Sequence, residues 1–174
     1  GYCVCLGKFF NKDITTLNLG YSGIIGIFFL ILYSYLSHFF TSHNYLHNSI
    51  LIFIGLFLFV KNFKSFINNR YFLILLIIFV LLFISLIIYK THDDFPYYHF
   101  PYTWYLTQKS MLIGTGQFNH GFRTPSSIFY LNSLFYLPHI KYYLFHMPAI
   151  LIMGFANIIL LKKIIQNIKK NSIN

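Results

Sequence analysis

Four long apolar runs follow one another along the chain, separated by polar segments. None of them contains Asp, Glu, Lys or Arg, and they cover residues 20–37, 45–60, 71–89 and 142–161. An α-helix of about 20 apolar residues crosses the hydrocarbon core of a bilayer. The pattern therefore predicts an all-α integral membrane protein with about four transmembrane helices.

The overall composition supports this prediction. Hydrophobic residues make up 57% of the chain and charged residues 9%, whereas about a quarter of the residues of a soluble domain are charged. So few charges cannot cover a surface that faces water. We therefore expect the lipid bilayer to be the main partner of this chain.

The positions of the basic residues predict an orientation. They gather before the first run, between the second and third runs, and after the fourth run: Lys8, Lys12, Lys61, Lys64, Arg70, Lys162, Lys163, Lys169 and Lys170. Segments rich in lysine and arginine stay on the cytoplasmic side of a membrane. The sequence therefore predicts a multi-pass protein of the inner (cytoplasmic) membrane, with both termini cytoplasmic and residues 90–141 forming an outward-facing loop.

The same positions argue against nucleic acid as a partner. The formal net charge is +10, but the cations lie beside apolar runs and form neither a basic recognition helix nor an RNA-binding sheet. The chain begins with glycine rather than methionine and has no internal repeat or linker. We interpret residues 1–174 as a single membrane domain and a fragment of a longer polytopic protein, whose missing helices would be further partners.

A short amphipathic helix is expected within the outward loop, at Ser126–Tyr136. It is too short to cross a bilayer, and prolines at positions 125 and 138 bound it. Asn132 and Ser133 are expected away from its apolar face, which would carry Ile128, Leu131, Leu134 and Phe135. Such a segment is typical of a helix that lies in the membrane interface.

The most unusual feature of the loop is a pair of neighbouring acids, Asp93 and Asp94, in a chain with three acidic residues. A structural interpretation is that Pro96 and Pro101 begin two helices, with Asp94 or His99 as the caps. An ion pair between an aspartate and Lys90 is a further structural interpretation.

A functional interpretation is also open, because a carboxylate at the membrane boundary is costly to desolvate. Such a group could act as a general base on an acceptor hydroxyl, with Arg123 holding a phosphate leaving group. Adjacent carboxylates, assisted by His92 or His99, also suit a divalent cation. We predict no other cofactor, and the irregular spacing of the histidines predicts no histidine metal cage.

Two short motifs in this loop resemble a known family. The first is D-x-x-x-Y-H-x-P, formed by Asp94, Tyr98, His99 and Pro101. The second is H-G-x-R, His120 to Arg123, and it is followed by Ser126-Ser127. Over roughly residues 71–161 these motifs resemble a family of largely uncharacterised bacterial multi-pass membrane proteins that are GT-C-like in outline. The general layout, an acidic residue in an outward loop, a glycine-rich turn, an arginine, a short interfacial helix and another span, resembles the GT-C glycosyltransferase superfamily, which includes protein O-mannosyltransferases and lipid A aminoarabinose transferases.

The resemblance implies a polyprenyl-phosphate-linked sugar donor and an acidic residue of an outward loop as the catalytic base. It favours Asp94 over Asp93 in this role, because Asp94 has the matching distance to the Tyr-His pair. Arg123 and His120 would contact the donor phosphate, and Tyr98 and His99 would contact the substrate. The chain departs from the superfamily pattern because three spans precede the loop here, where these enzymes generally place one.

We therefore expect part of a membrane glycosyltransferase that builds envelope glycans or glycolipids on the extracytoplasmic face. The alternative is a non-enzymatic membrane protein, such as a transporter, flippase or assembly subunit. Transporters generally place polar groups near the bilayer midplane. An enzyme is expected to bring Asp94 and Arg123 together at one outward site.

Overall fold

The structure, a computed structural model, describes residues 1–9, 18–64, 71–88, 93–123 and 126–171, and these residues form helices and turns without a β-strand. The longer helices are α1 (Tyr2–Phe9), α2 (Leu19–His38), α3 (Tyr45–Lys61), α5 (Phe72–Ile87), α6 (Phe100–Gln108), α7 (Ser127–Ser133) and α8 (Met147–Asn171). The short ones are the π-helix η2 (Phe95–His99) and the 3₁₀ turns η3 (Thr115–Gln117), η4 (His120–Phe122) and η5 (Tyr142–Leu144). The predicted all-α class is confirmed for these residues.

Two helical segments are long and apolar enough to cross a membrane, Leu19–His38 and Tyr142–Asn171. Only 22% and 28% of their apolar windows are buried, which distinguishes them from the buried core helix of a soluble protein. The helices at the second and third apolar runs, Tyr45–Lys61 and Tyr71–Ile87, are shorter. Two of the four expected spans therefore have the necessary length and composition.

The fourth apolar run differs from its expected bounds. Helix α8 begins at Met147 and continues to Asn171, ten residues beyond the end of the apolar run. Pro148 lies in the first turn of α8, where a missing backbone N–H costs nothing, so it begins the helix instead of interrupting it. The residues just before it form the turn Tyr142–Leu144.

The chain divides into two compact units. Unit 1 contains Gly1–Ile27, Gly55–Ile87 and Ala149–Asn174, and unit 2 contains Phe28–Ile54 and Ile88–Pro148. Helices α2, α3 and α8 each contribute residues to both units. The expected single membrane domain stays a prediction.

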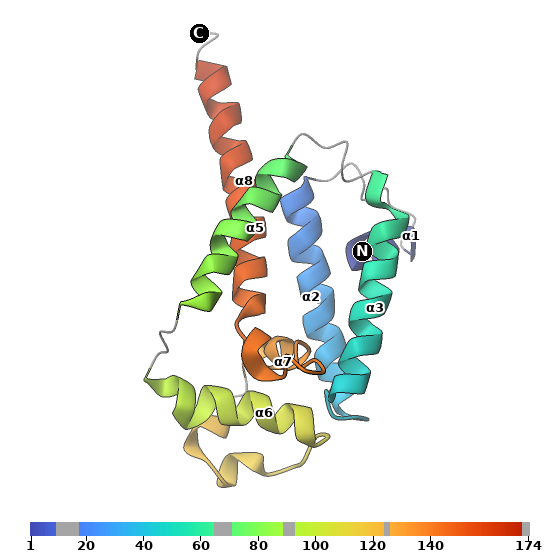
Figure 1. Cartoon of the computed structure of the whole chain (residues 1–174), viewed down its shortest axis with the longest axis vertical. Coiled ribbons are helices and arrows are strands. Elements are labelled where there is room, and N and C mark those ends of the chain that lie inside the picture. Colours follow the sequence, from blue (N-terminus) through green and yellow to red (C-terminus); the bar gives the residue numbers. More distant parts are fainter. Residues whose placement is uncertain (10–17, 65–70, 89–92, 124–125, 172–174) are drawn as a thin grey trace. The chain divides into compact units, whose positions relative to one another are not determined.

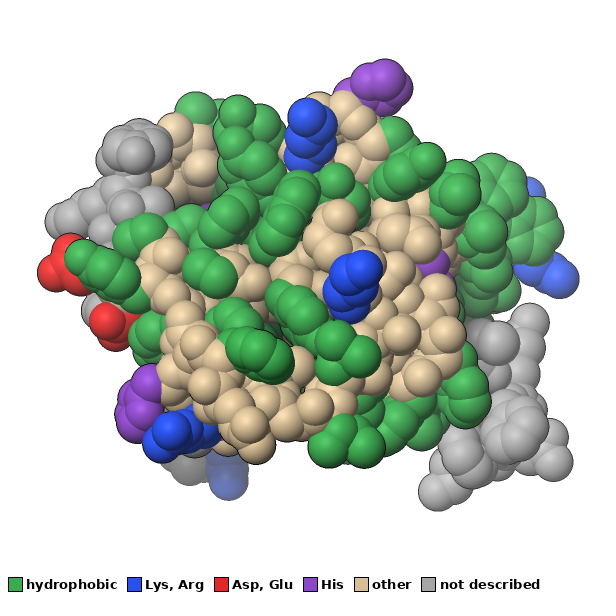
Figure 2. Space-filling model, turned by 90° about the horizontal axis from the view of Figure 1, so that it is seen from below, with side chains coloured by type: hydrophobic (Ala, Val, Ile, Leu, Met, Phe, Trp, Pro, Cys, Tyr) green, Lys and Arg blue, Asp and Glu red, His purple; other side chains and the backbone are tan. Residues whose placement is uncertain are grey.

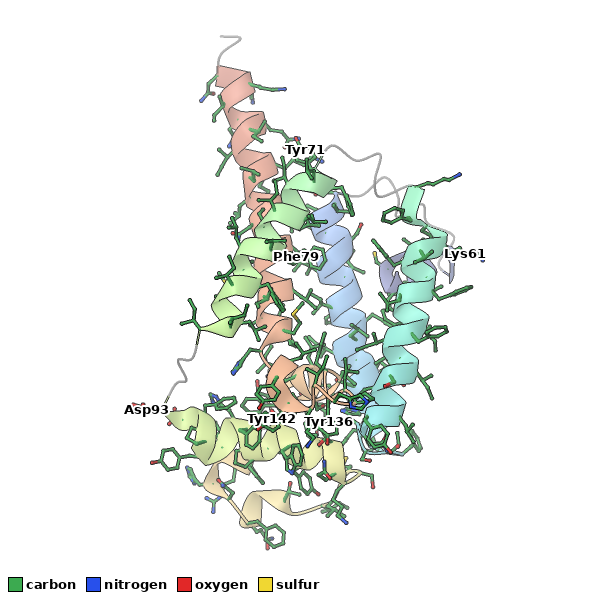
Figure 3. The ribbon with its side chains drawn as sticks, viewed as in Figure 1. Lys61, Tyr71, Phe79, Asp93, Tyr136 and Tyr142 are labelled. Atoms are coloured by element: carbon green, nitrogen blue, oxygen red, sulfur yellow. The ribbon has the colours of Figure 1, made fainter. Side chains whose placement is uncertain are left out.

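In unit 1 the helices pack through glycines. Gly20 and Gly23 of α2 lie against Phe155 of α8, and Gly154 of α8 lies against the ring of Phe79 from α5. The Phe79 and Phe155 rings meet edge to face at a centroid distance of 5.2 Å, and Figure 3 labels Phe79 where α5 runs beside α8. Small residues let the helix backbones approach closely, which is how helices associate in lipid.

In unit 2 the short helices form an aromatic core. The buried residues of this core are Tyr102 and Leu106 from α6 and Phe129 and Tyr130 from α7. Figure 1 shows α6 running across the end of α2 and the beginning of α3. The core thus lies at the end of the α2–α3 hairpin and fixes α6 to α7.

The segment expected to be an interfacial helix is α7. Its seven residues are too few to cross a bilayer, as expected. The predicted apolar face is wrong in one respect, because Ser133 is fully buried together with Phe129, Tyr130 and Leu131. The reason is a hydrogen bond from a distant histidine, which makes a polar residue a member of the buried face.

The glycine packing of unit 1 predicts different effects for two alanine substitutions in α2. A Cβ atom at Gly23 would overlap the Phe155 ring, whereas one at Gly26 would lie 3.8 Å from its nearest neighbour, in ordinary contact. Overpacking costs about 1–3 kcal/mol, and both substitutions gain the same helix propensity. We expect Gly23→Ala to lower the free energy of unfolding in mixed micelles and Gly26→Ala not to lower it. Equal stability of the two variants would contradict this packing.

Candidate functional site

The first motif of the outward loop begins with a π-helix. Asp94 is the N-cap residue of η2, Pro96 lies in its first turn, and the Phe100 N–H donates to the Phe95 carbonyl, as in a π-helix. Helix α6 follows directly, with His99 at its N-cap and Pro101 in its first turn. The expected positions of both prolines, in the first turns of two helices, are therefore confirmed. A single π-turn is uncommon and frequently occurs at functional sites.

Neither cap residue acts as a cap through its side chain. The side chains of Asp94 and His99 make no capping hydrogen bond to the helix that each precedes. The structural interpretation of Asp94 as a side-chain cap is therefore wrong. Asp93 is exposed at the beginning of η2, where Figure 3 labels it, and Asp94 is partly exposed. Lys90, the expected ion-pair partner of an aspartate, and His92, a possible ligand of a divalent cation, lie outside the described residues.

The second motif packs against the first. Gly121 lies so close to Tyr98 that a Cβ atom at position 121 would overlap the tyrosine side chain. The Asn119 side chain accepts a hydrogen bond of 2.8 Å from the Gly121 N–H and donates one of 3.4 Å to the Tyr97 carbonyl. Residues about twenty positions apart in sequence thus form one structure, η2 with η4, and a glycine is required at position 121.

Arg123 and His120 are exposed beside this contact. The Arg123 Nε–H donates to the Gly116 carbonyl at 3.3 Å, which ties the arginine to the preceding glycine turn and leaves its other guanidinium donors for a ligand. Gly114 begins that turn with a φ of 86°, a conformation that favours glycine. Figure 2 shows the acidic side chains together at one edge of this face of the molecule.

The His99 ring lies against the core of unit 2. Its ring is 5.0 Å from the Phe129 ring and 4.3 Å from the Tyr98 ring, measured between centroids. Among the residues described, no group of three or more histidine, cysteine, aspartate or glutamate side chains is suited to hold a metal ion. The structure therefore brings the predicted residues into one unit without forming a metal centre there.

The sequence did not predict a buried polar cluster around Asn48, which holds this unit together. His43, Asn48 and Ser133 are each 0% exposed. The Asn48 Nδ2 group lies within hydrogen-bonding distance of three backbone carbonyls, those of His43 at 2.7 Å, Ser133 at 2.8 Å and Tyr136 at 3.0 Å, so that one of its two protons is shared. One side chain of α3 thus ties the α2–α3 connection to the end of α7.

Hydrogen bonds fix the protonation of His47. The three carbonyl partners of Asn48 orient its amide, so its Oδ1 is the acceptor for the His47 Nδ1–H at 2.9 Å. The His47 Nε2 lies 2.9 Å from the Tyr33 hydroxyl, which can either donate or accept. The His47 ring therefore carries a proton on Nδ1.

The same reasoning applies to His43. Ser133 Oγ lies 2.7 Å from the Tyr130 carbonyl, which can only accept, so the serine donates there. Ser133 must then accept from the His43 Nδ1–H at 2.6 Å, and the His43 Nε2 accepts from Ser37 at 3.0 Å. His43 is neutral in this arrangement, because burial lowers the pKa of its ring.

The C-terminal end of α6 is attached to the same connection. The His43 N–H donates to the Leu106 carbonyl at 2.9 Å, and the Met111 N–H donates to the His38 carbonyl at 3.0 Å. The His38 Nε2–H donates to the Lys109 carbonyl at 2.9 Å. Both α6 and α7 are therefore held at the end of the α2–α3 hairpin, and η2 continues from α6.

A signal for this cluster is present in the sequence. The stretch from His38 to Asn48 contains three histidines and two asparagines but no lysine or arginine. The lack of cations in this stretch is also what is expected of a segment on the outward side of a membrane. Such a high density of uncharged polar side chains between two apolar helices indicates side chains that are buried and hydrogen-bonded to one another or to the backbone.

Comparison with protein-family models, curated proteins and solved structures found no match for this chain.

The Asn48 cluster predicts a large effect of one substitution. Asn48→Ala removes the donor shared by three buried carbonyls, and each unsatisfied buried group costs about 1–3 kcal/mol. We expect a loss of about 2–4 kcal/mol in the free energy of unfolding. The matched control is Asn62→Ala just after the end of α3, which removes one bond, to the Leu58 carbonyl of that helix. If both variants lose the same stability, Asn48 does not have this role.

The neutral His43 predicts a pH dependence. Burial, followed by the neighbouring His38 and His47 rings, lowers the pKa of His43 from 6.5 to about 3. Below pH 6.5 His43 binds a proton in the unfolded state but not in the folded state. The free energy of unfolding therefore falls as the pH drops below 6.5. Between pH 7 and pH 5 we expect a loss of at most about 2 kcal/mol in the free energy of unfolding.

The measurement is denaturant unfolding at both pH values, for the wild type and two variants. His43→Gln should flatten the dependence, whereas His139→Gln, at an exposed position of the same unit, should keep it. Unchanged or higher stability of the wild type at pH 5 would show that His43 is not buried in its neutral form.

Proposed function

We propose that this chain is part of a membrane glycosyltransferase that uses a lipid-linked sugar donor on the extracytoplasmic face, for envelope glycan or glycolipid assembly. In this proposal it is a multi-pass protein of the cytoplasmic membrane with four spans and both described ends on the cytoplasmic side. Unit 2 contains the outward loop and the reaction site.

The surface of the long helices supports the lipid environment. Exposed large apolar side chains cover α2, α3, α5 and α8, among them Phe28, Leu32, Leu36, Ile50, Phe53, Leu56, Phe57, Val60, Leu73, Val80, Leu81, Ile87, Met153 and Leu160. Water-soluble proteins rarely expose apolar patches of more than a few hundred Å². In a bilayer these side chains contact lipid, and the two shorter helices cross with their polar flanking residues at the interface.

The contact between Tyr98 and Gly121 is the observation that carries the catalytic part of the proposal. It joins the motif that contains Asp94 to the motif that contains His120 and Arg123. The hydrogen bonds of Asn119 to Gly121 and Tyr97 hold the two segments against each other. The two segments supply the two charges that sugar transfer from a phosphate needs.

The reaction uses these residues as follows. Asp94 takes the proton of an acceptor hydroxyl, and the acceptor oxygen forms a bond to the anomeric carbon of the donor sugar. The bond between that carbon and the phosphate oxygen breaks, and its electron pair leaves with the lipid phosphate. Arg123 and His120 stabilise the negative charge on this leaving group. Tyr98 and His99 position the sugar beside the π-helix.

The test compares two neighbouring carboxylates in the full-length parent gene. We expect Asp94→Asn to lower transfer by at least about 100-fold, because it removes the general base, and Asp93→Asn to leave most of the activity. The readout is one envelope glycan, followed by gel and mass spectrometry at matched membrane levels.

Arg123→Gln provides a second measurement of the same site. It should lower transfer, and Arg123→Lys should restore part of it because the positive charge returns without the guanidinium fork. Unchanged glycans in both aspartate variants would instead favour the non-enzymatic alternative, a transporter, flippase or assembly subunit.

A further inference from the structure

The last turns of α8 form an amphipathic extension, which we define as residues 161–171. Helix α8 has 25 residues without a break, so it is about 37 Å long at 1.5 Å per residue. A hydrocarbon core is about 30 Å thick. A span that begins at Met147 therefore has its last turns in the headgroup layer.

The extension has two different faces. With 100° between successive residues, an apolar stripe forms along one face from Leu161, Ile164, Ile165 and Ile168. Ile164 is 54% exposed and Ile168 is 62% exposed, so unit 1 covers neither of them. The lysines occupy the remaining arc: Lys162, Lys163, Lys169 and Lys170.

The charge of this segment is of one sign. Four lysines fall within nine residues, and residues 142–174 contain no aspartate or glutamate. A cluster of four or more basic residues next to a membrane span attracts anionic lipid headgroups, with about 1 kcal/mol for each lysine near the surface. Lysine side chains are long enough to reach the phosphates while the isoleucines stay at the edge of the acyl chains.

We propose that residues 161–171 are a docking surface for anionic phospholipids. The apolar stripe continues the surface of the span into the headgroup layer, and the lysines bind the lipid phosphates. A partner helix fits less well, because the stripe covers about one heptad and a coiled coil needs at least about three. The inference depends on no step of the proposed reaction and concerns a different end of the chain.

The experiment measures lipid selectivity of the full chain by electron paramagnetic resonance. The chain is reconstituted in phosphatidylcholine vesicles that contain a small amount of spin-labelled phosphatidylglycerol or spin-labelled phosphatidylcholine. We expect the protein to immobilise the anionic label about fivefold more strongly. High salt should reduce this preference, since headgroup attraction is electrostatic.

Two matched pairs of substitutions locate the site. Lys163→Gln with Lys170→Gln removes two exposed charges from one face of the extension, and Lys61→Gln with Lys64→Gln removes two exposed charges at the end of α3. The first pair should lower the preference several-fold and the second pair should lower it much less. Circular dichroism should show the same helix content in both.

Two results would overturn the inference. One is an equal preference for the anionic label in the wild type and in the Lys163→Gln, Lys170→Gln variant. The other is self-association of the chain that Ile164→Ser with Ile168→Ser abolishes in phosphatidylcholine alone, which would assign the stripe to a second copy of the chain.

Discussion

The hydrogen bonds of the Asn48 amide are the interaction on which unit 2 depends. One Nδ2 group satisfies three buried carbonyls, from the α2–α3 connection and from the end of α7, while its Oδ1 accepts from His47. Inside a region with little water, an unpaired carbonyl is costly, so α7 cannot leave the hairpin without exposing several at once. The arrangement also requires a proton on Nδ1 of His43, because Ser133 donates to the Tyr130 carbonyl and can only accept from that ring.

The position of the candidate reaction site follows from this constraint. Helix α6 is attached to the same connection through the carbonyls of Leu106 and Lys109, and it packs on α7 through Tyr102 and Tyr130. The π-helix that carries Asp94 continues directly into α6. The polar cluster around Asn48 thus holds the C-terminal end of α6, and Asp94 precedes η2 at the other end of α6. The Tyr98–Gly121 contact then places the turn that contains His120 and Arg123 against η2. Sites supported in this way by packed elements keep their geometry better than sites on isolated loops.

The sequence predicted the features that depend on local chemistry. Apolar runs gave the long helices, and Pro96 and Pro101 gave the first turns of η2 and α6, because proline is favoured there whatever surrounds it. Features that depend on distant partners were not predictable. Ser133 was assigned to the wrong face of α7, since its burial comes from His43, ninety residues away. The π-turn at Phe95–His99 has no periodic signature over five residues, and α8 extends past its apolar run because its lysines and isoleucines still suit a helix.

The proton positions of His43 and His47 provide the most direct test of this account, because the whole cluster depends on them. The measurement is nuclear magnetic resonance of the chain labelled with ¹⁵N-histidine in bicelles at pH 7, with each signal assigned by a single histidine substitution. We predict a proton on Nδ1 of both rings and, because burial lowers the pKa of His43, an unprotonated Nε2 on that ring. An unprotonated Nδ1 on either ring, or an imidazolium at His43, would contradict the hydrogen bonds of this cluster and with them the attachment of α6 and α7 to the hairpin.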